Sequence, residues 1–367
     1  MSKAAELAAL IGSGQAQGNK NFVINGDMQC WQRATAATAA SNTYSTVDRW
    51  ALSESTDGAY TSERSTDTPT GTGYSLKLQV TTADTSIAAA QYSYILHEIE
   101  AQNLQSLQYG TSSAKTLTLS FWVKSNKTGT YTIDLVKRDS TAYYIPVEYT
   151  ISSANTWEKK TITITPTAGS TSFITASAAA IANDNGHGIQ LGFGLAWGSN
   201  YHGTSNTWSA SSHYGTSNQV NWMDSTSNNF YLAQVQLEIG EVATAFEHED
   251  VSTTLRKCQR YYAKSWSQGS AVTTNPGVIG AACVGNVNRA FGNVFWPVTM
   301  RTAPTVTWYS GSTGTVNKWR NATQGTDITA AAAIAGIGES GYGFVLSAGI
   351  NGVTDTLQGH YQAVAEL

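Results

Sequence analysis

From Asn21 onward the chain is dominated by short runs in which apolar and polar residues alternate, separated by Gly, Asn, Ser and Thr. An alternation of period two places successive side chains on opposite faces of a strand, so each run predicts a strand with one apolar face and one face in water. The clearest runs are Tyr74–Val80, Leu117–Val123, Tyr131–Val136 and Trp157–Thr165. Many short strands joined by small polar turns predict an all-β fold, a jelly-roll β-sandwich.

The first residues depart from this alternation. Ser2–Ile11 is rich in alanine, with Ser2 placed to cap a helix and Gly12 placed to end it. Such a helix is shorter than the roughly 12 residues at which an isolated helix becomes marginal, so it needs a surface to pack on. We therefore expect an anchor that docks on copies of itself or on a larger assembly, followed by a Gly-rich linker. The anchoring side chains would be Leu7, Leu10 and Ile11.

A second helix is predicted inside the β-rich region, over His97–Leu107. Ile99, Leu104 and Leu107 would lie near a common face of that helix, and the turn residues Tyr109-Gly110 follow it.

The stretch from Ala196 to Ser227 is rich in Ser, Gly and Asn but also in aromatic residues. Long loops in compact domains are usually functional or disordered, and disordered segments are poor in aromatics, so we expect an ordered loop. Aromatic rings stack on the C–H faces of sugars, and neutral polar side chains bond to hydroxyl groups. The loop therefore predicts a glycan site, although aromatic residues also serve as core. The candidate residues are Trp197, Tyr201, His202, Trp208, His213 and Tyr214, whereas Trp222 fits the core better.

The other tryptophans are assigned by their position in strand-like runs. Trp31, Trp50, Trp122 and Trp157 are predicted to lie in the core. Trp319, between Lys318 and Arg320, reads as an exposed turn that could also contact an acidic polysaccharide.

A domain boundary is expected at the polar run His248-Glu249-Asp250, after which strand-like runs resume. The predicted organisation is an N-terminal anchor and linker (1–20), a jelly roll (21–250) and a smaller C-terminal β-sandwich domain (251–367).

Charge and composition exclude several classes of protein. The formal net charge is −4, and no Lys or Arg occurs between Lys160 and Arg256, so no nucleic-acid partner is expected. No run approaches the roughly 20 apolar residues of a membrane span, so we expect no membrane insertion, and no signal peptide is evident. Cys30, Cys258 and Cys283 form no CxxC pair, which favours thiols in a protein made in a reducing cytoplasm.

No catalytic or metal motif stands out. Two pairs of carboxylates could be considered for glycoside hydrolysis: Glu98 with Glu100, which would diverge on a helix, and Asp184 with Asp224, which only the fold could bring together. No GxSxG elbow or phosphate-binding Gly-rich loop is present. The spacings of His187, His202 and His213 match no zinc motif. We therefore expect a non-enzymatic protein without metal or cofactor.

Several strings, taken in order, resemble bacteriophage tail fibres that carry a carbohydrate-binding-module-like jelly roll. Asn21–Arg33 (NFVINGDMQCWQR) resembles the opening of that jelly roll, and Val47–Trp50 (VDRW) resembles the motif that follows it. The other similar strings are Leu117–Tyr131, Asn229–Glu241 with Ala243–Glu247, Cys258–Tyr262, Trp296–Arg301 and Ala363–Leu367. Modules of this fold often hold calcium through an aspartate on the last strand, but Tyr231–Val235 has no acid, so the metal site is not carried over.

The resemblance implies a receptor-binding fibre of the virion, made in the host cytoplasm and usually a homotrimer. Its expected partners are other copies of itself, other virion proteins through the N-terminal segment, and host cell-surface polysaccharide. Two alternatives stay open: a capsid decoration or spacer protein that keeps the fold without sugar binding, and a glycan hydrolase.

Overall fold

A computed structural model of the chain describes residues 20–38, 43–268, 270, 272, 277–283, 290–329, 332–346 and 355–367. The chain divides into two compact units, one comprising Met1–Gln29, Ala34–Asp250 and Leu367, the other Cys30–Arg33 and Val251–Glu366. Leu7, Leu10 and Ile11 lie outside the described residues, so their anchoring role stays a prediction.

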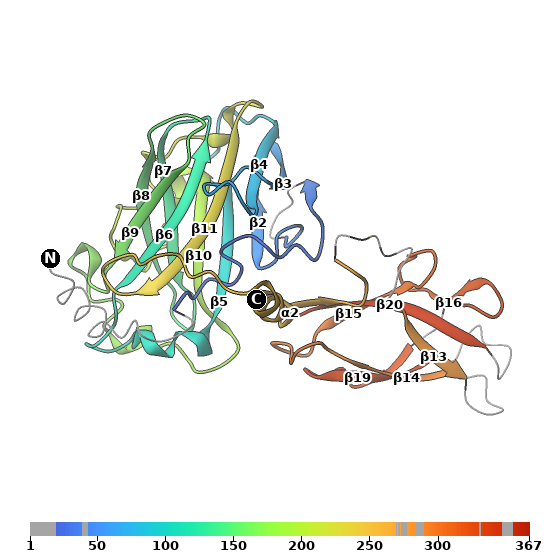
Figure 1. The fold of residues 1–367 in the computed structure, drawn as a ribbon. Coiled ribbons are helices and arrows are strands. Elements are labelled where there is room, and N and C mark those ends of the chain that lie inside the picture. The colour runs from blue at the N-terminus through green and yellow to red at the C-terminus, as the bar shows by residue number, and fades with distance from the viewer. Residues whose placement is uncertain are drawn as a thin grey trace. The chain divides into compact units, whose positions relative to one another are not determined.

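The first unit is an antiparallel β-sandwich of two sheets (Figure 1). The six-stranded sheet has the order β1 (Ala36–Thr38), β3 (Ala59–Ser65), β4 (Ser75–Thr82), β11 (Asn229–Ile239), β6 (Leu117–Ser125) and β9 (Glu158–Ile164). The five-stranded sheet has the order β2 (Trp50–Glu54), β5 (Tyr92–Glu100), β10 (His187–Trp197), β7 (Gly129–Lys137) and β8 (Tyr143–Ile151). The predicted all-β sandwich is therefore confirmed.

The core lies between these two sheets and follows from the alternation in the sequence. Phe121 of β6 packs edge-on against Phe193 of β10, with ring centroids 5.1 Å apart. Ile133 and Leu232, from opposite sheets, are also fully buried. Trp50 donates its indole N–H to the Asn25 carbonyl at 3.1 Å, which ties the turn at Asn25-Gly26 to the core. Trp50 and Trp222 are buried in this unit, as predicted, and Trp31, which belongs to the second unit, is buried as well.

The helix predicted over His97–Leu107 is correct only in its second half. The alternation of β5 continues to Glu100, and a 3-10 helix, η1 (Ala101–Leu107), follows it. Leu104 and Leu107 are buried, because a spacing of three residues suits a 3-10 helix.

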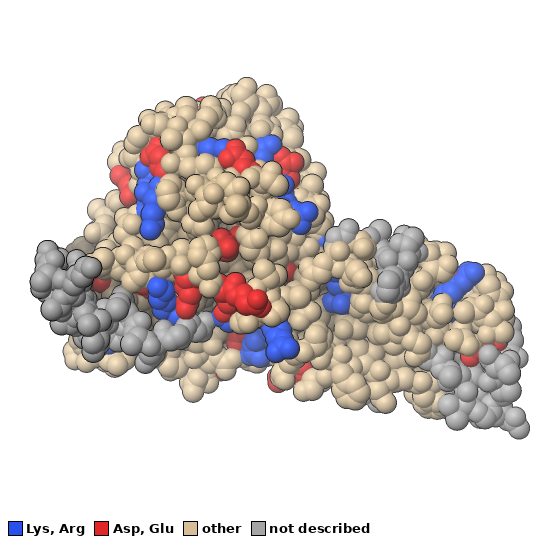
Figure 2. Space-filling view, viewed as in Figure 1, with Lys and Arg blue, Asp and Glu red and all other residues tan. Residues whose placement is uncertain are grey.

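Trp122 and Trp157 are not in the core, contrary to the prediction. Both are half-buried. In β6 the inward positions are the odd-numbered Phe121 and Val123, so Trp122 has to face outward. The surface around this sheet is mostly uncharged in the view of Figure 2.

The second unit begins with α2 (Val251–Gln259), and its described strands form one antiparallel sheet centred on a long last strand. The path runs β17 (Thr326–Ile328), β16 (Trp319–Asn321), β20 (Thr356–Val364), β13 (Ile279–Cys283), β14 (Ala290–Phe295), β19 (Gly341–Leu346) and β18 (Ala332–Ala335). β12 (Tyr262–Lys264) and β15 (Thr305–Ser310) also pair with β20.

Trp319 lies in the core of this unit, so its predicted exposure is wrong. Its side chain is 1% exposed, and its ring centroid is 4.6 Å from that of Trp308 and 5.1 Å from that of Phe344. The flanking Arg320 points to the other side of β16, where it lies 3.5 Å from Asp327. A charged neighbour on each side is therefore compatible with burial in a strand, because adjacent side chains point in opposite directions.

We expect Trp319→Ala to lower the free energy of unfolding by about 3 to 5 kcal/mol, because it leaves a cavity among packed aromatic rings. The control Arg320→Ala removes a partly exposed ion pair and should cost less than about 1 kcal/mol. Urea denaturation followed by circular dichroism measures both. Similar losses for the two variants would contradict this placement of Trp319.

Candidate functional site

The outward face of the five-stranded sheet carries the candidate site. Alternation turns Ile95, His97 and Ile99 of β5, and Leu191 and Phe193 of β10, toward the other sheet. The residues left on the outward face include Tyr92, Tyr94 and Glu98 on β5, Gln190, Gly192 and Gly194 on β10, Asp134 on β7 and Tyr144 on β8.

The loop that leaves β10 is fixed against the edge strand β8. Tyr144 and Ser209 exchange two backbone hydrogen bonds of 2.9 Å. Farther along, the Glu148 carboxylate accepts from the Thr216 hydroxyl at 2.5 Å and from the Asn218 amide at 3.1 Å. These bonds hold an ordered loop beside the outward face of the sheet.

Six aromatic side chains gather where this loop meets the sheet. They form the aromatic cluster, which consists of Tyr92, Tyr94, Tyr144, Trp197, Tyr201 and Tyr214. Trp197 is its centre: it stacks on Tyr214 with centroids 5.2 Å apart and an interplanar angle of 18°, and its centroid is 4.8 Å from that of Tyr94. Trp197 is only 7% exposed, whereas the five tyrosines are half-buried and reach the surface.

The structure brings together three of the six candidate residues from the loop: Trp197, Tyr201 and Tyr214. His202 borders them, with Nε2 3.0 Å from the Trp197 carbonyl oxygen. His213 is half-buried and makes none of the ring contacts found among the described residues of the cluster.

Trp208 lies elsewhere. It is 1% exposed and donates its indole N–H to the Thr165 carbonyl at 2.9 Å. Its backbone N–H also donates to the Ala168 carbonyl, so the Ala196–Ser227 loop packs here against the segment that follows β9. The Trp208 side chain is therefore part of the core. A sugar on the surface could not stack on it.

Two glycines of β10 make room on the sheet beneath the cluster. A Cβ at Gly192 would lie 2.0 Å from Asp134 Oδ2, and a Cβ at Gly194 would lie 2.2 Å from Trp197 Nε1. Any side chain at either position would displace these polar atoms. The glycines thus let a carboxyl group and an indole N–H lie directly on the backbone of the central strand.

Buried polar atoms meet in this space. We call Asp134, Gln190, Gln219 and the indole N–H of Trp197 the polar floor. Gln190 donates to Asp134 Oδ1 at 3.2 Å, and Gln219 accepts from the Thr132 hydroxyl. Three atoms of the floor have no hydrogen-bond partner among the described residues: Asp134 Oδ2, Trp197 Nε1 and Gln219 Nε2. Burying such an atom unbonded costs about 1 to 3 kcal/mol, so the polar floor lowers the stability of the fold.

Burial raises the pKa of Asp134 to about 8, outweighing the hydrogen bond from Gln190 and the charge of Arg138, both of which lower it. Near neutral pH this carboxyl group is therefore mostly protonated. It can then donate a hydrogen bond as well as accept one.

A cleft of about 280 Å³ lies on the same sheet face. Tyr94 lines it, so the cleft and the aromatic cluster share this ring. Glu98, whose side chain is 4% exposed, lies 3.7 Å from Arg138 Nη2 and 3.3 Å from His187 Nδ1. The cleft therefore offers hydrogen-bond donors and acceptors beside an aromatic wall.

The carboxylate pairs considered for catalysis do not form a matched acid and base. Glu98 and Glu100 lie on strand β5 and not on a helix, so they share a face of the sheet and do not diverge. Both are buried, and Glu100 accepts a hydrogen bond from the Gln102 amide. Asp184 is an exposed turn residue that accepts from the Gly186 N–H at 2.8 Å, just before β10 begins. Asp224 lies near the start of β7, which pairs with the other end of β10, so the two aspartates are at opposite ends of the sheet.

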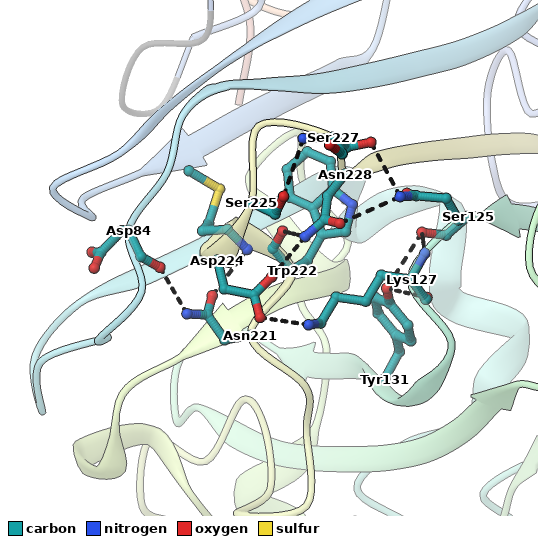
Figure 3. A network of polar contacts seen from close by, with 12 residues as sticks. Asp84, Ser125, Lys127, Tyr131, Asn221, Trp222, Asp224, Ser225, Ser227 and Asn228 are labelled. Atoms are coloured by element: carbon teal, nitrogen blue, oxygen red, sulfur yellow. Dashed lines mark hydrogen bonds and ion pairs between the residues drawn. The ribbon is translucent and has the colours of Figure 1, made fainter.

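Asp224 belongs to a polar network that closes the loop (Figure 3). Its carboxylate lies 2.6 Å from Lys127 Nζ and accepts from the Asn228 amide at 2.8 Å. Trp222 donates its indole N–H to the Asn229 carbonyl at 3.0 Å. The network holds the end of the loop in place where the chain enters β11. Trp222 is part of this junction, which explains why it is buried.

Sequence reasoning missed Tyr92, Tyr94, Asp134 and Arg138. The alternation Tyr92-Ser93-Tyr94-Ile95 contained a signal for the first two, which the helix prediction beginning at His97 obscured.

Among the described residues, no group of three or more His, Cys, Asp or Glu side chains could hold a metal ion. The described helices include none that is both long enough and apolar enough to cross a membrane.

No protein-family model matches the sequence, and no curated protein matches it. Similar solved structures include the enzymatically active domain of tailspike protein 4 from bacteriophage CBA120, with 10% identity, a TM-score of 0.30 and coverage of 60% of this chain. The chain spans 22% of that tailspike chain. A putative sugar-binding protein from Bacteroides thetaiotaomicron has 9% identity and a TM-score of 0.36, covering 60% of this chain and 100% of its own. The carbohydrate-binding module TmCBM61, in complex with β-1,4-galactotriose, has 10% identity and a TM-score of 0.29, with the same coverage. These likenesses assign no residue of the site.

We expect Asp134→Asn to change how stability depends on pH. Because the pKa of this carboxyl is raised from 3.8 to about 8, the folded chain holds more protons than the unfolded chain between these values, and stability falls as pH rises through that range. The asparagine variant lacks this contribution, so its stability relative to the parent should rise with pH by at most about 1.4 kcal/mol per pH unit.

Urea denaturation between about pH 5 and 8 measures this difference. The control is Asp184→Asn, at an exposed aspartate of the same unit. A constant stability difference between Asp134→Asn and the parent would show that Asp134 is ionised throughout.

Proposed function

We propose that this chain is a virion structural protein, a phage tail fibre or adhesin that binds host surface glycan on the outward face of its five-stranded sheet. The observation that carries the proposal is the aromatic cluster beside the polar floor. Sugar rings offer C–H faces to aromatic rings and hydroxyl groups to polar atoms, and this face supplies partners for both within one short stretch of sheet.

The tyrosines, and not Trp197, would make the stacking contacts. One face of Trp197 is covered by Tyr214, and little of its side chain is exposed. Tyr94 lines the cleft, and Tyr201 lies at the edge of the cluster, where its hydroxyl donates to the Ala90 carbonyl at 3.2 Å. That bond and the ring contacts hold the rings in place before a ligand arrives, which reduces the entropy lost on binding.

The polar groups of this face suit a neutral sugar. Asp134 is mostly protonated near neutral pH, and the charge of Glu98 lies close to that of Arg138. A hydroxyl group donates and accepts at once, so it can pair with the polar side chains that line the cleft, such as Arg138 and Gln190.

The virion setting rests on the resemblance of the sequence strings to phage fibres. In that setting the N-terminal segment attaches the chain to other virion proteins, and a homotrimer presents three copies of the site. Several weak sites on one particle give strong overall attachment when their spacing lets them bind together.

One observation favours the alternative of a capsid decoration or spacer protein. Trp197 and Trp208, both predicted to meet the ligand, are instead buried and hold the loop in place. The position of the chain on the particle separates the two functions: a location on the tail or fibre supports attachment, and a location in the capsid lattice supports decoration.

We expect Tyr94→Ala and Tyr201→Ala each to weaken binding to the recognised glycan about three- to tenfold, because each removes an aromatic contact worth roughly 0.5 to 1.5 kcal/mol. An array of bacterial surface polysaccharides identifies the ligand, and titration of the positive glycan gives the affinities.

Phe295→Ala is the matched control, because it removes an aromatic side chain that is 79% exposed in the second unit. Circular dichroism checks the fold of each variant. Binding that is unchanged in both tyrosine variants, or reduced equally by Phe295→Ala, would refute the site.

A further inference from the structure

The outward face of the six-stranded sheet carries a second set of aromatic and basic side chains, far from the aromatic cluster described above. We call it the second platform, and its residues are Trp122, Lys124, Trp157, Lys159 and Tyr231. The three aromatic residues are half-buried, and Lys159 is exposed. None of them takes part in the core between the sheets.

The strand register places these side chains side by side. Lys124 of β6 pairs directly with Tyr231 of β11. Trp122, two positions along the same face of β6, pairs with Lys159 of β9. Trp157 immediately precedes β9 and lies two positions from Lys159 on the same face. Cross-strand neighbours have Cβ atoms roughly 5 Å apart, so these side chains form one continuous surface.

Two rings of the second platform, those of Trp157 and Tyr231, are held in a fixed orientation. Asp67 accepts from the Trp157 indole N–H at 2.9 Å and also pairs with Lys124. Lys124 Nζ lies 4.2 Å from the centroid of the Tyr231 ring and 5.2 Å from that of the Trp157 ring. The Trp157 and Tyr231 rings meet edge to face at 6.0 Å. Two half-buried aromatic rings are thus locked on a surface that faces solvent.

The charges on this face leave one cation uncompensated. Lys124 pairs with Asp67, and Lys77 pairs with Glu63 on the neighbouring strands. Lys159 has no ion pair among the described residues, and it lies directly opposite Trp122. Figure 2 shows this side of the first unit, where a few basic and acidic patches lie next to broad uncharged areas. A ligand that lies flat on the rings would therefore meet a free positive charge.

We propose that the second platform binds an acidic polysaccharide, with Trp122 and Trp157 stacking on sugar rings and Lys159 pairing with a uronate carboxylate. A neutral sugar would leave Lys159 unused. A second copy of the same face, packed symmetrically, would bring like charges together. The second platform binds independently of the site on the five-stranded sheet, so either can fail without the other.

The test uses polygalacturonate and the same polymer with its carboxylates methyl-esterified. Both polymers offer the same sugar rings, and only the first carries charge. We expect the parent protein to bind polygalacturonate more tightly than the ester, with a preference that falls as salt is added. We expect Lys159→Ala to weaken binding to polygalacturonate about two- to fivefold at low salt, and Lys159→Glu to weaken it further. Binding to the ester should change little in either variant.

Lys115→Ala is the matched control, because Lys115 is also an exposed lysine of the first unit. Trp122→Ala should weaken binding to both polymers about three- to tenfold, because it removes the stacking surface. Thermal unfolding shows whether that variant folds; if it does not, the lysine variants decide alone.

Three results would overturn the proposal. The first is equal binding of the two polymers. The second is a loss in Lys159→Ala no greater than in Lys115→Ala. The third is loss of polygalacturonate binding in Tyr94→Ala, which would place the acidic chain on the other sheet. Sedimentation of Trp122→Ala adds one more outcome: if this change dissociates an oligomer, a second copy and not a glycan occupies the face. A failure of the site on the five-stranded sheet would be recognised by a different result, namely unchanged glycan binding in Tyr94→Ala and Tyr201→Ala.

Discussion

Burial of one face of each sheet against the other is the interaction on which the first unit depends. It fixes the side of the sheet on which every strand residue lies, because a shift of one position in register would move the whole apolar set of a strand into water. The side chains at the outward positions are then not needed for the core between the two sheets. Tyr94 and Asp134 on one sheet, and Trp122 and Tyr231 on the other, occupy such positions. Both candidate surfaces are therefore consequences of the same core.

The outward face of the five-stranded sheet is unusual because its loop brings its own aromatic residues to it. Trp197 fills the space above Gly194, and Asp134 fills the space above Gly192. This arrangement leaves buried polar atoms without hydrogen-bond partners in the described part of the chain, and it leaves an acid that is hard to ionise; both lower stability. A fold selected only for stability would place apolar side chains there. The retained polar atoms are the physical reason to regard this face as a binding surface.

Local alternation was sufficient to predict the clearest strands and the all-β fold, because successive strand residues face opposite sides of the sheet. It did not show which side faces the core, so Trp122 and Trp157 were wrongly assigned to the core and Trp319 to the surface. It failed where two patterns overlap: the spacing of Leu104 and Leu107 suggested a helix from His97, although β5 runs to Glu100. It also failed where burial depends on distant residues. Trp208 is buried where its indole N–H donates to the carbonyl of the distant Thr165. Asp134 resembles any other polar strand residue in the sequence, and only the strand register places it against Gly192. Tertiary contacts decide such positions, so no local pattern reveals them.

The two outward faces of a sandwich point in opposite directions, and this limits how a ligand can use them. A single short oligosaccharide cannot reach both faces, because the two sheets and their core lie between them, with sheets roughly 10 Å apart in a packed sandwich. Two different chains of a cell-surface polymer layer can occupy the two faces at the same time. If both faces bind as proposed, binding one chain would hold the other face at a high local concentration of its own ligand, and the two weak sites would reinforce each other. Under the proposed attachment role, opposite faces with different chemistry would therefore serve a mixed glycan coat better than two copies of one site on the same face.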